Sequence, residues 1–312
     1  MSGQPRFPKD DIVDADLLPL EYLHIKSFNY MKHFSLLILS AALLVATACG
    51  SSNKITVNPD NGFPAINQNG KIAVIAHRGF WNCEEGGFSE NSLAALKASQ
   101  KYGFWGCECD IHITADDVII VNHDDDINGK LIWDHKYSDF DQDLLPNGEK
   151  RPTLDQFLQQ VKKCRKTVLV IEFKIQKDSD REDLMVDKTI EMLKKYGLYD
   201  PNRIAFISFG RHMCQKIAAE HPQFINQFLS GKVAPSVMAE EKINGLDYHY
   251  SNFQLWPEFV AQAHQLGMSV NAWTIDKEEP VQEMIGLDVD AITTNKPLMV
   301  RELLGKREFK KR

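Results

Sequence analysis

The chain has 312 residues, of which 43% are hydrophobic and 25% are charged, and its formal net charge is −7. This composition is typical of a globular protein long enough for one large α/β domain or two smaller ones. Proteins that bind a nucleic-acid backbone carry basic surfaces, so the acidic balance excludes a nucleic-acid partner. In the sequence, no apolar run reaches the roughly 18 residues that a membrane-spanning helix needs.

The first informative segment begins at Met31, where a basic start leads into a core of roughly 15 apolar residues, as in a secretory signal. Small residues then precede Cys49, and Ala46-Thr47-Ala48-Cys49 resembles a bacterial lipobox, in which the cysteine is lipidated. Lipoboxes usually carry Leu or Val where this chain has Ala46, and a plain signal peptide cut nearby is the alternative. We predict that residues 31–48 are a lipoprotein signal peptide and that Cys49 carries the lipid.

The segments on either side of this signal follow from it. A signal rarely begins thirty residues into a chain, so we expect residues 1–30 to be a non-native extension and Met31 to be the true start. Residues 49–70 are polar and rich in Asn, Pro and Gly, which predicts a flexible tether. The expected location is the bacterial cell envelope, with the N-terminal lipid in a membrane and the protein facing the periplasm or the cell surface. The sequence indicates no oligomeric state.

After the tether, short runs rich in Val and Ile alternate with helical patterns, which implies parallel strands joined by helical crossovers. Eight such units fit a (β/α)8 TIM barrel formed by residues 71–306. A doubly wound sheet is the alternative, but no Gly-rich phosphate loop follows the first strand. The predicted strands are 72–77, 106–111, 167–173, 203–208, 223–228, 246–250, 269–274 and 289–293. The predicted helices are 91–102, 153–164, 181–196, 211–220, 235–243, 257–266, 277–286 and 297–305.

One further apolar run, VIIVNHD at 118–124, interrupts this alternation after the second strand. About five residues separate it from that strand, whereas a parallel crossover needs a dozen or more. The run is therefore predicted to be a hairpin arm outside the barrel. Residues 125–150, which are polar and rich in Gly, Asp and Asn, are predicted to be an insertion at the end of the barrel where the loops carry chemistry.

Strand alternation assigns the acids and cysteines of the second strand to opposite faces. Glu108 and Asp110 share one face, and Cys107 and Cys109 share the other, where they would pack against helices as small hydrophobic residues. A zinc site at the two cysteines is the alternative, but no second ligand pair stands at a suitable spacing. The five cysteines after Cys49 are odd in number and scattered, which does not indicate a disulfide framework.

Three carboxylates are predicted to meet at one end of the barrel. Glu172, at the end of the strand TVLVIEFK, repeats the inward placement of Glu108 and Asp110. Each acid alone could be a solvated charge at a strand end. Because buried carboxylates are costly unless they are paired or bound to a cation, their shared end of the barrel favours an all-oxygen site for Ca²⁺ or Mg²⁺.

Two histidines and two basic residues are expected beside these acids. His77 and His123 each end an apolar strand at the same end of the barrel, where they would act as general acid and base around an anion. Arg78 would hold a phosphate through its planar guanidinium, and Lys174 would add a point charge.

The motifs that carry these residues resemble the glycerophosphodiester phosphodiesterase family, over about residues 72–300. The resemblance implies a phosphodiesterase barrel with one divalent cation, His77 and His123 as the acid/base pair, and Glu108, Asp110 and Glu172 as metal ligands. It also implies that Arg78 and Lys174 contact phosphate and that Trp273 lines the substrate site. The motifs are HRG at 77–79, SENS at 89–92, ECD at 108–110, VNHD at 121–124, IEFK at 171–174 and NAWTID at 271–276.

The chain departs from the family pattern in three places. The usual Pro-Glu-Asn-Thr is Ser-Glu-Asn-Ser at 89–92, and the Thr-x-Asp-Gly hairpin is Thr-Ala-Asp-Asp at 114–117. Near the end, Asn295 replaces an aspartate. We expect the lost charge at Asn295 to affect contacts at the edge of the substrate and not the chemistry.

The resemblance implies hydrolysis of a glycerophosphodiester to glycerol phosphate and an alcohol. The substrate's own hydroxyl would attack to give a cyclic phosphate, which water then opens, with the two histidines exchanging roles. One alternative is a phospholipase C- or D-like enzyme that acts on intact phospholipid. Another is a lipid-anchored binding protein on a catalytically inactive barrel.

Overall fold

The computed structural model describes residues 72–310, in which eight parallel strands close into a barrel. The pairing of Ile75 with Gly106 and of Ala76 with Cys107 joins the first and second strands and completes the closure. The predicted (β/α)8 barrel is therefore confirmed, and an open doubly wound sheet is excluded. The barrel strands are β1 (Ala73–Ala76), β2 (Gly106–Ile113), β6 (Val168–Phe173), β7 (Ile204–Ser208), β8 (Ile225–Phe228), β9 (Gly245–His249), β10 (Ser269–Trp273) and β11 (Ala291–Thr294).

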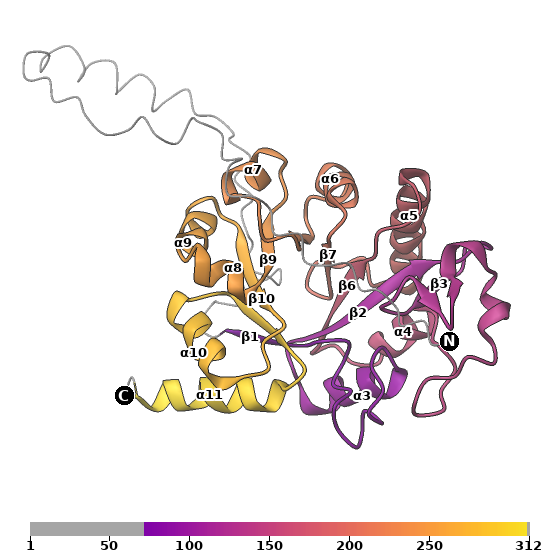
Figure 1. Ribbon diagram of the computed structural model, residues 1–312, viewed down its shortest axis with the longest axis horizontal. Helices are drawn as coiled ribbons and strands as arrows, with labels where there is room; N and C mark the ends of the chain where they lie inside the picture. Colours follow the sequence, from indigo (N-terminus) through magenta and orange to yellow (C-terminus); the bar gives the residue numbers. More distant parts are fainter. Residues whose placement is uncertain (1–71, 311–312) are drawn as a thin grey trace, which may run out of the picture. The chain divides into compact units, whose positions relative to one another are not determined.

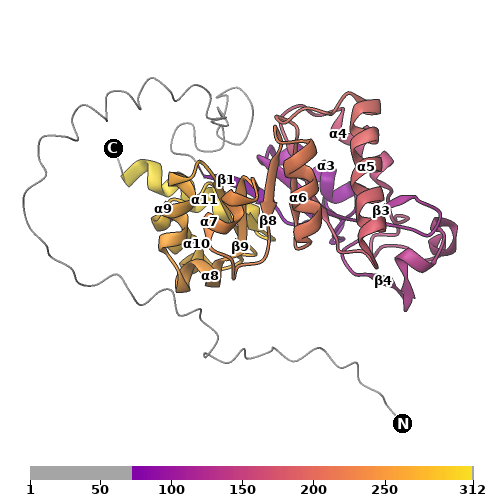
Figure 2. The same ribbon diagram turned by 90° about the horizontal axis from the view of Figure 1, so that it is seen from above.

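Helices surround the strands in Figures 1 and 2. Local signals fix several of their ends: Ser92 caps the first helix, and Thr153 forms a capping box with Gln156 at the next. In the part of the chain that the structure describes, no helix combines the length and the apolar character needed to cross a membrane. The predicted helices appear as α3 (Leu93–Tyr102), α4 (Leu154–Val161), α5 (Ser179–Tyr196), α6 (Arg211–Glu220), α7 (Pro235–Glu240), α9 (Glu258–Gln265), α10 (Glu278–Leu287) and α11 (Pro297–Lys310).

One helix, α8 (Tyr250–Leu255), was not predicted. It begins immediately after β9, and the predicted strand 246–250 therefore included the first residue of this helix. Its N-terminus is capped by the imidazole of His249, which accepts a hydrogen bond from the backbone nitrogen of Ser251 at 3.3 Å. Histidine is not among the usual cap residues, so the sequence carried no ordinary start signal.

The predicted hairpin arm is confirmed as β3 (Ile119–Val121), which pairs antiparallel with β2. The insertion that follows has a small hydrophobic cluster of its own, formed by Ile120, Ile127, Ile132 and Phe140. Beyond β3, its members come from a short hairpin and from two turns of 3-10 helix. The hairpin consists of β4 (Asp126–Ile127) and β5 (Lys130–Leu131), and the two turns are Ile132–Asp134 and Tyr137–Phe140. The insertion is thus a folded cap and not merely a polar excursion.

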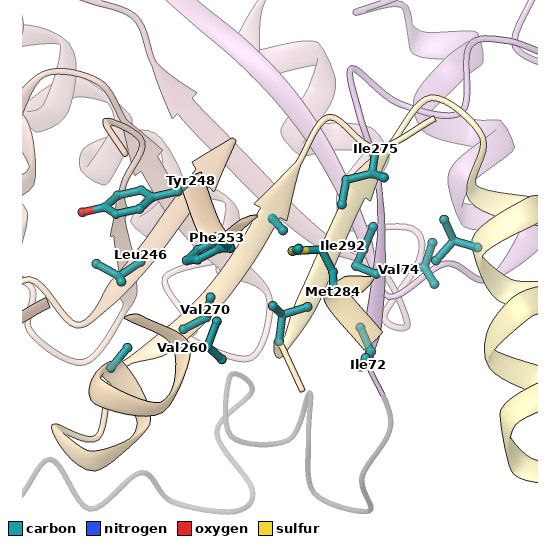
Figure 3. Close-up of a cluster of buried hydrophobic side chains, with 14 of the residues drawn as sticks. Ile72, Val74, Leu246, Tyr248, Phe253, Val260, Val270, Ile275, Met284 and Ile292 are labelled. Carbon is teal, nitrogen blue, oxygen red and sulfur yellow. The ribbon is translucent and has the colours of Figure 1, made fainter. Parts of the chain in front are cut away.

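Alternate residues of each strand face the helices or the barrel interior. Leu246 and Tyr248 of β9 and Val270 of β10 pack against α8 and α9 in the helix layer that Figure 3 shows. Cys107 and Cys109 are fully buried in the equivalent layer beside α4, which confirms their predicted packing role. The interior takes Ile75, Val170, Ile207 and other small or branched side chains. Glu108, Asp110 and Glu172 continue this interior set toward the carboxyl ends of the strands.

Candidate functional site

The three predicted carboxylates come together at the carboxyl end of the barrel. The pairing of β2 with β6 sets Asp110 opposite Glu172, and Glu108 lies one inward position earlier on β2. One oxygen from each residue lies within 4.8 Å of the other two, and all three residues are buried. Glu108 Oε1 is buried and has no hydrogen-bond partner among the described residues. The donor set, three carboxylate oxygens and no soft ligand, fits a hard divalent cation.

The electrostatics of the trio also favour a bound cation. Burial, followed by the charges of Asp110 and Glu172, raises the pKa of Glu108 well above its usual value. Burial and then Asp110 raise the pKa of Glu172 to about 7. Burial opposes ionisation of Asp110 as well, but Lys174, His123 and the Asn91 amide together lower its pKa. A divalent ion would offset the burial and the mutual repulsion that favour the protonated forms of Glu108 and Glu172.

Each basic residue of the site is paired with acids. Arg78 Nη1 donates to Glu90 Oε1 and Oε2 at 2.8 and 2.9 Å, and Lys174 Nζ lies 2.8 Å from Glu172 Oε1. Glu90 belongs to the SENS motif, but no role was predicted for it. Its neighbour Asn91 donates to Asp110 Oδ2 at 2.8 Å. The SENS segment therefore positions both Arg78 and a candidate metal ligand.

The HRG motif makes a left-handed turn after β1. Arg78 has φ 53°, and its backbone nitrogen donates a 2.6 Å hydrogen bond to Glu108 Oε2. Gly79 has φ 79°, and a Cβ at this position would lie 2.7 Å from the Cβ of Ala95 in α3. The glycine thus permits a left-handed turn and a close helix contact, which aim the Arg78 amide at the acid cluster.

His77 and His123 lie in different surroundings. His77 follows β1, and its Nδ1 lies 2.9 Å from Asn295 Oδ1. Burial, then the charge of Arg78, lowers the pKa of His77. His123 follows β3 on the arm, is about one third exposed at 34%, and has its Nδ1 2.7 Å from Asp124 Oδ1. Both histidines are close enough to Asp110 for their charges to interact with it, which places both beside the acid cluster.

Asn295 lies in contact with a candidate catalytic residue. We expected its replacement of an aspartate to affect the substrate edge and not the chemistry, but it contacts His77 directly. Its Oδ1 also accepts a hydrogen bond from Trp81 Nε1 at 3.0 Å, and its Nδ2 donates to Asp276 Oδ2 at 2.8 Å. The sequence could not show this network because Asn295 lies 218 residues from His77.

An aromatic wall stands at the same end of the barrel. Trp273 Nε1 donates to the carbonyl of Asp247 at 2.8 Å, which fixes the indole at the end of β10. Phe209 and His249 contact this indole edge to face, with centroid distances of 5.6 and 5.4 Å. Phe209 and Ile175 are 40% and 52% exposed. Only Trp273 was predicted, although each of the others stands at or just after the end of a strand.

Deeper in the barrel, Asp247 is a buried acid that the sequence analysis missed. Both of its carboxylate oxygens lack a hydrogen-bond partner among the described residues, as does Oδ1 of its neighbour on β10, Asn271. Burial raises the pKa of Asp247 well above its usual value; Asn271 offsets part of this shift, and the charge of Glu172 adds to it.

The five cysteines of the described residues are free thiols. Burial raises the pKa of Cys107 and of Cys214 to about 12, and it raises that of Cys109 as well. These three thiols are buried among apolar side chains, and within residues 72–310 the group of side chains that could hold a metal is Glu108, Asp110 and Glu172 and includes no cysteine.

Residues 77–299 match the model of the glycerophosphoryl diester phosphodiesterase family, well over half of the chain. A glycerophosphodiester phosphodiesterase of Caldanaerobacter subterraneus subsp. tengcongensis is 26% identical over 250 residues, covering 76% of this chain and 99% of that protein.

Solved structures agree with this match. A glycerophosphodiester phosphodiesterase from Parabacteroides distasonis is 36% identical with a TM-score of 0.73, covering 76% of this chain and 98% of that one. An Oleispira antarctica phosphodiesterase, solved with the product sn-glycerol-3-phosphate, has the same fold at 21% identity, with a TM-score of 0.63 and coverage of 75% and 96%. The matched span contains every barrel strand after β1 and every candidate site residue of the described part, and the chain belongs to the glycerophosphoryl diester phosphodiesterase family.

Proposed function

We propose that this enzyme hydrolyses glycerophosphodiesters to glycerol phosphate and an alcohol, with His77 and His123 as the acid/base pair. The observation that carries the proposal is the grouping of three buried carboxylates, two histidines and two cationic side chains at one end of the barrel. The product bound to the Oleispira antarctica phosphodiesterase, sn-glycerol-3-phosphate, is a compound of the expected class.

The reaction needs one proton acceptor and one proton donor. In the first step a hydroxyl of the glycerol moiety attacks phosphorus, one histidine takes its proton, and the other protonates the departing alkoxide. A cyclic phosphate results, and water opens it with the two histidines in exchanged roles. Arg78 and Lys174 would neutralise the phosphate charge by leaving their present carboxylate partners for the substrate oxygens.

Glu108, Asp110 and Glu172 would hold one divalent cation, Ca²⁺ or Mg²⁺. When bound, such an ion stabilises negative charge on phosphate oxygens. The Glu108 side chain is fixed by the Arg78 amide, and Asp110 by Asn91, so two of the three ligands are held in place before an ion arrives.

The decisive experiment is a phosphodiesterase assay of the full chain on a panel of glycerophosphodiesters, with and without chelator. We expect release of glycerol phosphate that stops with EDTA and resumes with Ca²⁺ or Mg²⁺. Release that is unaffected by chelation, or equal in the Glu108→Gln variant, would contradict the metal assignment. No release from any member of the panel would contradict the proposed reaction.

A second candidate substrate class, intact phospholipid, is favoured by the aromatic wall. Phe209, Trp273 and the exposed Ile175, which follows Lys174 in the chain, offer apolar surface at the carboxyl ends of the strands that a purely polar alcohol group would not use. Ile127 and Ile132 of the insertion do not add to it, because both are buried in the small cluster there. Lysophospholipid and phospholipid in the same assay panel separate the two classes.

The cellular placement is also a proposal. Residues 1–30, the signal at 31–48, Cys49 and the tether at 49–70 lie outside the described residues. The lipobox pattern supports attachment to a membrane of the bacterial envelope through a lipid on Cys49, with the barrel facing the periplasm or the cell surface. This placement would keep the enzyme close to the diesters released from membrane lipids.

A further inference from the structure

The network behind His77 fixes which of its ring nitrogens can exchange protons. Asn295 Oδ1 lies 2.9 Å from His77 Nδ1 and 3.0 Å from Trp81 Nε1, while Asn295 Nδ2 lies 2.8 Å from Asp276 Oδ2. A tryptophan indole nitrogen can only donate, and an ionised carboxylate can only accept. The Asn295 amide therefore has a single orientation that satisfies both neighbours, with its oxygen toward Trp81 and His77.

Because the amide oxygen can only accept, His77 Nδ1 must carry a proton. We propose that Asn295, locked by Trp81 and Asp276, is a positioning residue that keeps the proton on Nδ1 of His77, so that Nε2 alone exchanges protons and His77 acts as the base of the first step. The proposal deepens the proposed function and rests on it only for the catalytic use of His77.

Asp276 makes the lock rigid. Its Oδ1 accepts hydrogen bonds from the backbone nitrogen of Asn295 at 2.8 Å and from Thr294 Oγ1 at 3.0 Å. Both ends of the Asn295 residue are thus held by one carboxylate, and the side chain cannot rotate away from His77 without breaking these bonds. Thr294 is fully buried and Asp276 and Asn295 are partly buried, so the bond between Thr294 and Asp276 is shielded from water.

The charges around His77 suit a base. Burial, followed by the charge of the adjacent Arg78, disfavours an imidazolium and lowers the pKa of His77, whereas the hydrogen bond to Asn295 and the charges of Asp110 and Glu90 offset only part of this shift. The amide oxygen of Asn295 accepts a hydrogen bond from Nδ1 without placing a negative charge next to the ring. The carboxylate of Asp276 contacts Asn295 and is therefore separated from the ring by that amide. His77 is consequently neutral before the reaction, with the Nε2 lone pair free to accept a proton, and His123 on the arm is left to donate one.

The first test is independent of turnover. Long-range ¹H–¹⁵N spectra of the imidazole rings in the full chain should show a protonated Nδ1 and an unprotonated Nε2 for His77 above its pKa. Asn295→Ala removes the acceptor and should yield a mixture of tautomers, whereas Asn295→Asp should keep the Nδ1 proton. A His77 protonated on Nε2 in the native chain would overturn the proposal, whatever the activity.

The second test separates positioning from general stability. Asn295→Ala should lower kcat about tenfold or more with little change in KM, because a hydrogen bond that orients the base is lost. Asn295→Asp should restore turnover and move the acidic limb of kcat/KM upward by about 1 pH unit, because a negative partner raises a histidine pKa. Leu298→Ala is the matched control: it changes an exposed side chain at the start of α11, close to Asn295 in the chain, and it should change neither the spectrum nor the pH profile.

The outcomes distinguish this inference from the proposed function. An inactive native chain with the expected His77 tautomer would contradict the proposed reaction and still support the proposed role of Asn295. If the native chain is active and Asn295→Ala has the native kcat, pH profile and His77 spectrum, the proposed role of Asn295 is contradicted and the proposed reaction is not. If Asn295→Ala does not fold, the native spectrum and the Asn295→Asp pH profile still decide the proposal.

Discussion

The ammonium group of Lys174 lies 2.8 Å from Glu172 Oε1 and 3.5 Å from Asp110 Oδ1, so one cation bridges two carboxylates of the acid cluster. Despite the burial of Lys174, these carboxylates raise its pKa. The lysine therefore stays charged and partly neutralises the cluster in the metal-free protein. Occupation of the cluster by a divalent ion would free this charge for the substrate phosphate.

We expect the affinity of the full chain for Ca²⁺ or Mg²⁺ to rise by about tenfold between about pH 6 and pH 8. The pKa of Glu172 is about 7, above its ordinary value of 4.5, so at lower pH a proton competes with the ion. For the same reason the metal-free fold loses stability as the pH rises from 4.5 to about 7, and bound metal restores it. Titration calorimetry at the two pH values measures the change.

The control for this prediction is another glutamate. Glu172→Gln should weaken binding and remove most of its pH dependence. Glu191→Gln, an exposed position on α5, lowers the charge equally and should have no effect. Equal pH dependence in both variants would show that the ion binds elsewhere.

The two histidines should differ in how a better leaving group affects them. Replacing His77 or His123 by Ala should lower turnover by about 10²- to 10⁴-fold on ordinary diesters, with non-additive losses in the double variant. On a nitrophenyl diester, whose leaving group needs little protonation, His123→Ala should recover most of its rate and His77→Ala should not. His212→Ala, on the exposed face of α6, serves as control. Rescue of His77→Ala instead would reverse the assigned roles.

Replacing the buried carboxyl group of Asp247 by an amide should stabilise the fold at neutral pH. Because the folded-state pKa of Asp247 is raised above its ordinary 3.8, the native chain loses stability as the pH rises from that value toward the raised pKa. Asp247→Asn removes this loss, and the new amide can donate to the unpartnered Asn271 Oδ1. We expect a gain of about 1–3 kcal/mol in the free energy of unfolding at pH 8, from denaturant titration, and a smaller gain at pH 5. A larger gain at the lower pH would contradict the argument.

The aromatic wall should act on the alcohol part of the substrate. Phe209→Ala removes a ring that is 40% exposed and contacts Trp273, so we expect KM to rise about tenfold for lysophospholipid. Glycerophosphoethanolamine, which lacks an acyl chain, should be affected much less. Leu266→Ala, an exposed apolar residue just after α9, is the control. An equal rise in KM for both substrates would show that the aromatic wall does not select the substrate.

The anchor prediction concerns residues outside the described part of the chain. If Cys49 is lipidated, the native protein should require detergent for extraction and Cys49→Ser should release it into the soluble fraction. Translation from Met31 should give the same mature product. Detection of residues 1–30 on the mature protein by mass spectrometry would be incompatible with the predicted signal.

Strand alternation made much of the site accessible from the sequence. Glu108, Asp110 and Glu172 could be assigned to the interior because side chains alternate with a fixed period of two, and the same rule assigned Cys107 and Cys109 to the helix layer. The hairpin arm followed from the short spacing between two apolar runs, which no parallel crossover could span.

What the sequence could not provide are contacts that depend on barrel closure. Asn295 meets His77 only because β11 pairs with β1, and this neighbour relation has no local signal in a pattern of short strands. Asp247 lay in a strand recognised for its apolar residues, so its inward carboxylate went unnoticed. Glu90 was seen as part of a motif, yet its partner Arg78 could be identified only from the turn that brings the two together.

The arm that carries His123 affects how readily denaturant inactivates the enzyme. β3 spans three residues and pairs as a strand with β2 alone, apart from one bridge between Ile120 and Thr153, whereas β1 lies between two parallel neighbours. Segments with fewer cross-strand bonds open at lower free energy than the rest of a domain. Mild denaturant should therefore separate the two histidines while the barrel stays closed, and inactivation should precede the loss of circular dichroism. The working range of this enzyme is then limited by a three-residue hairpin rather than by the melting of the barrel.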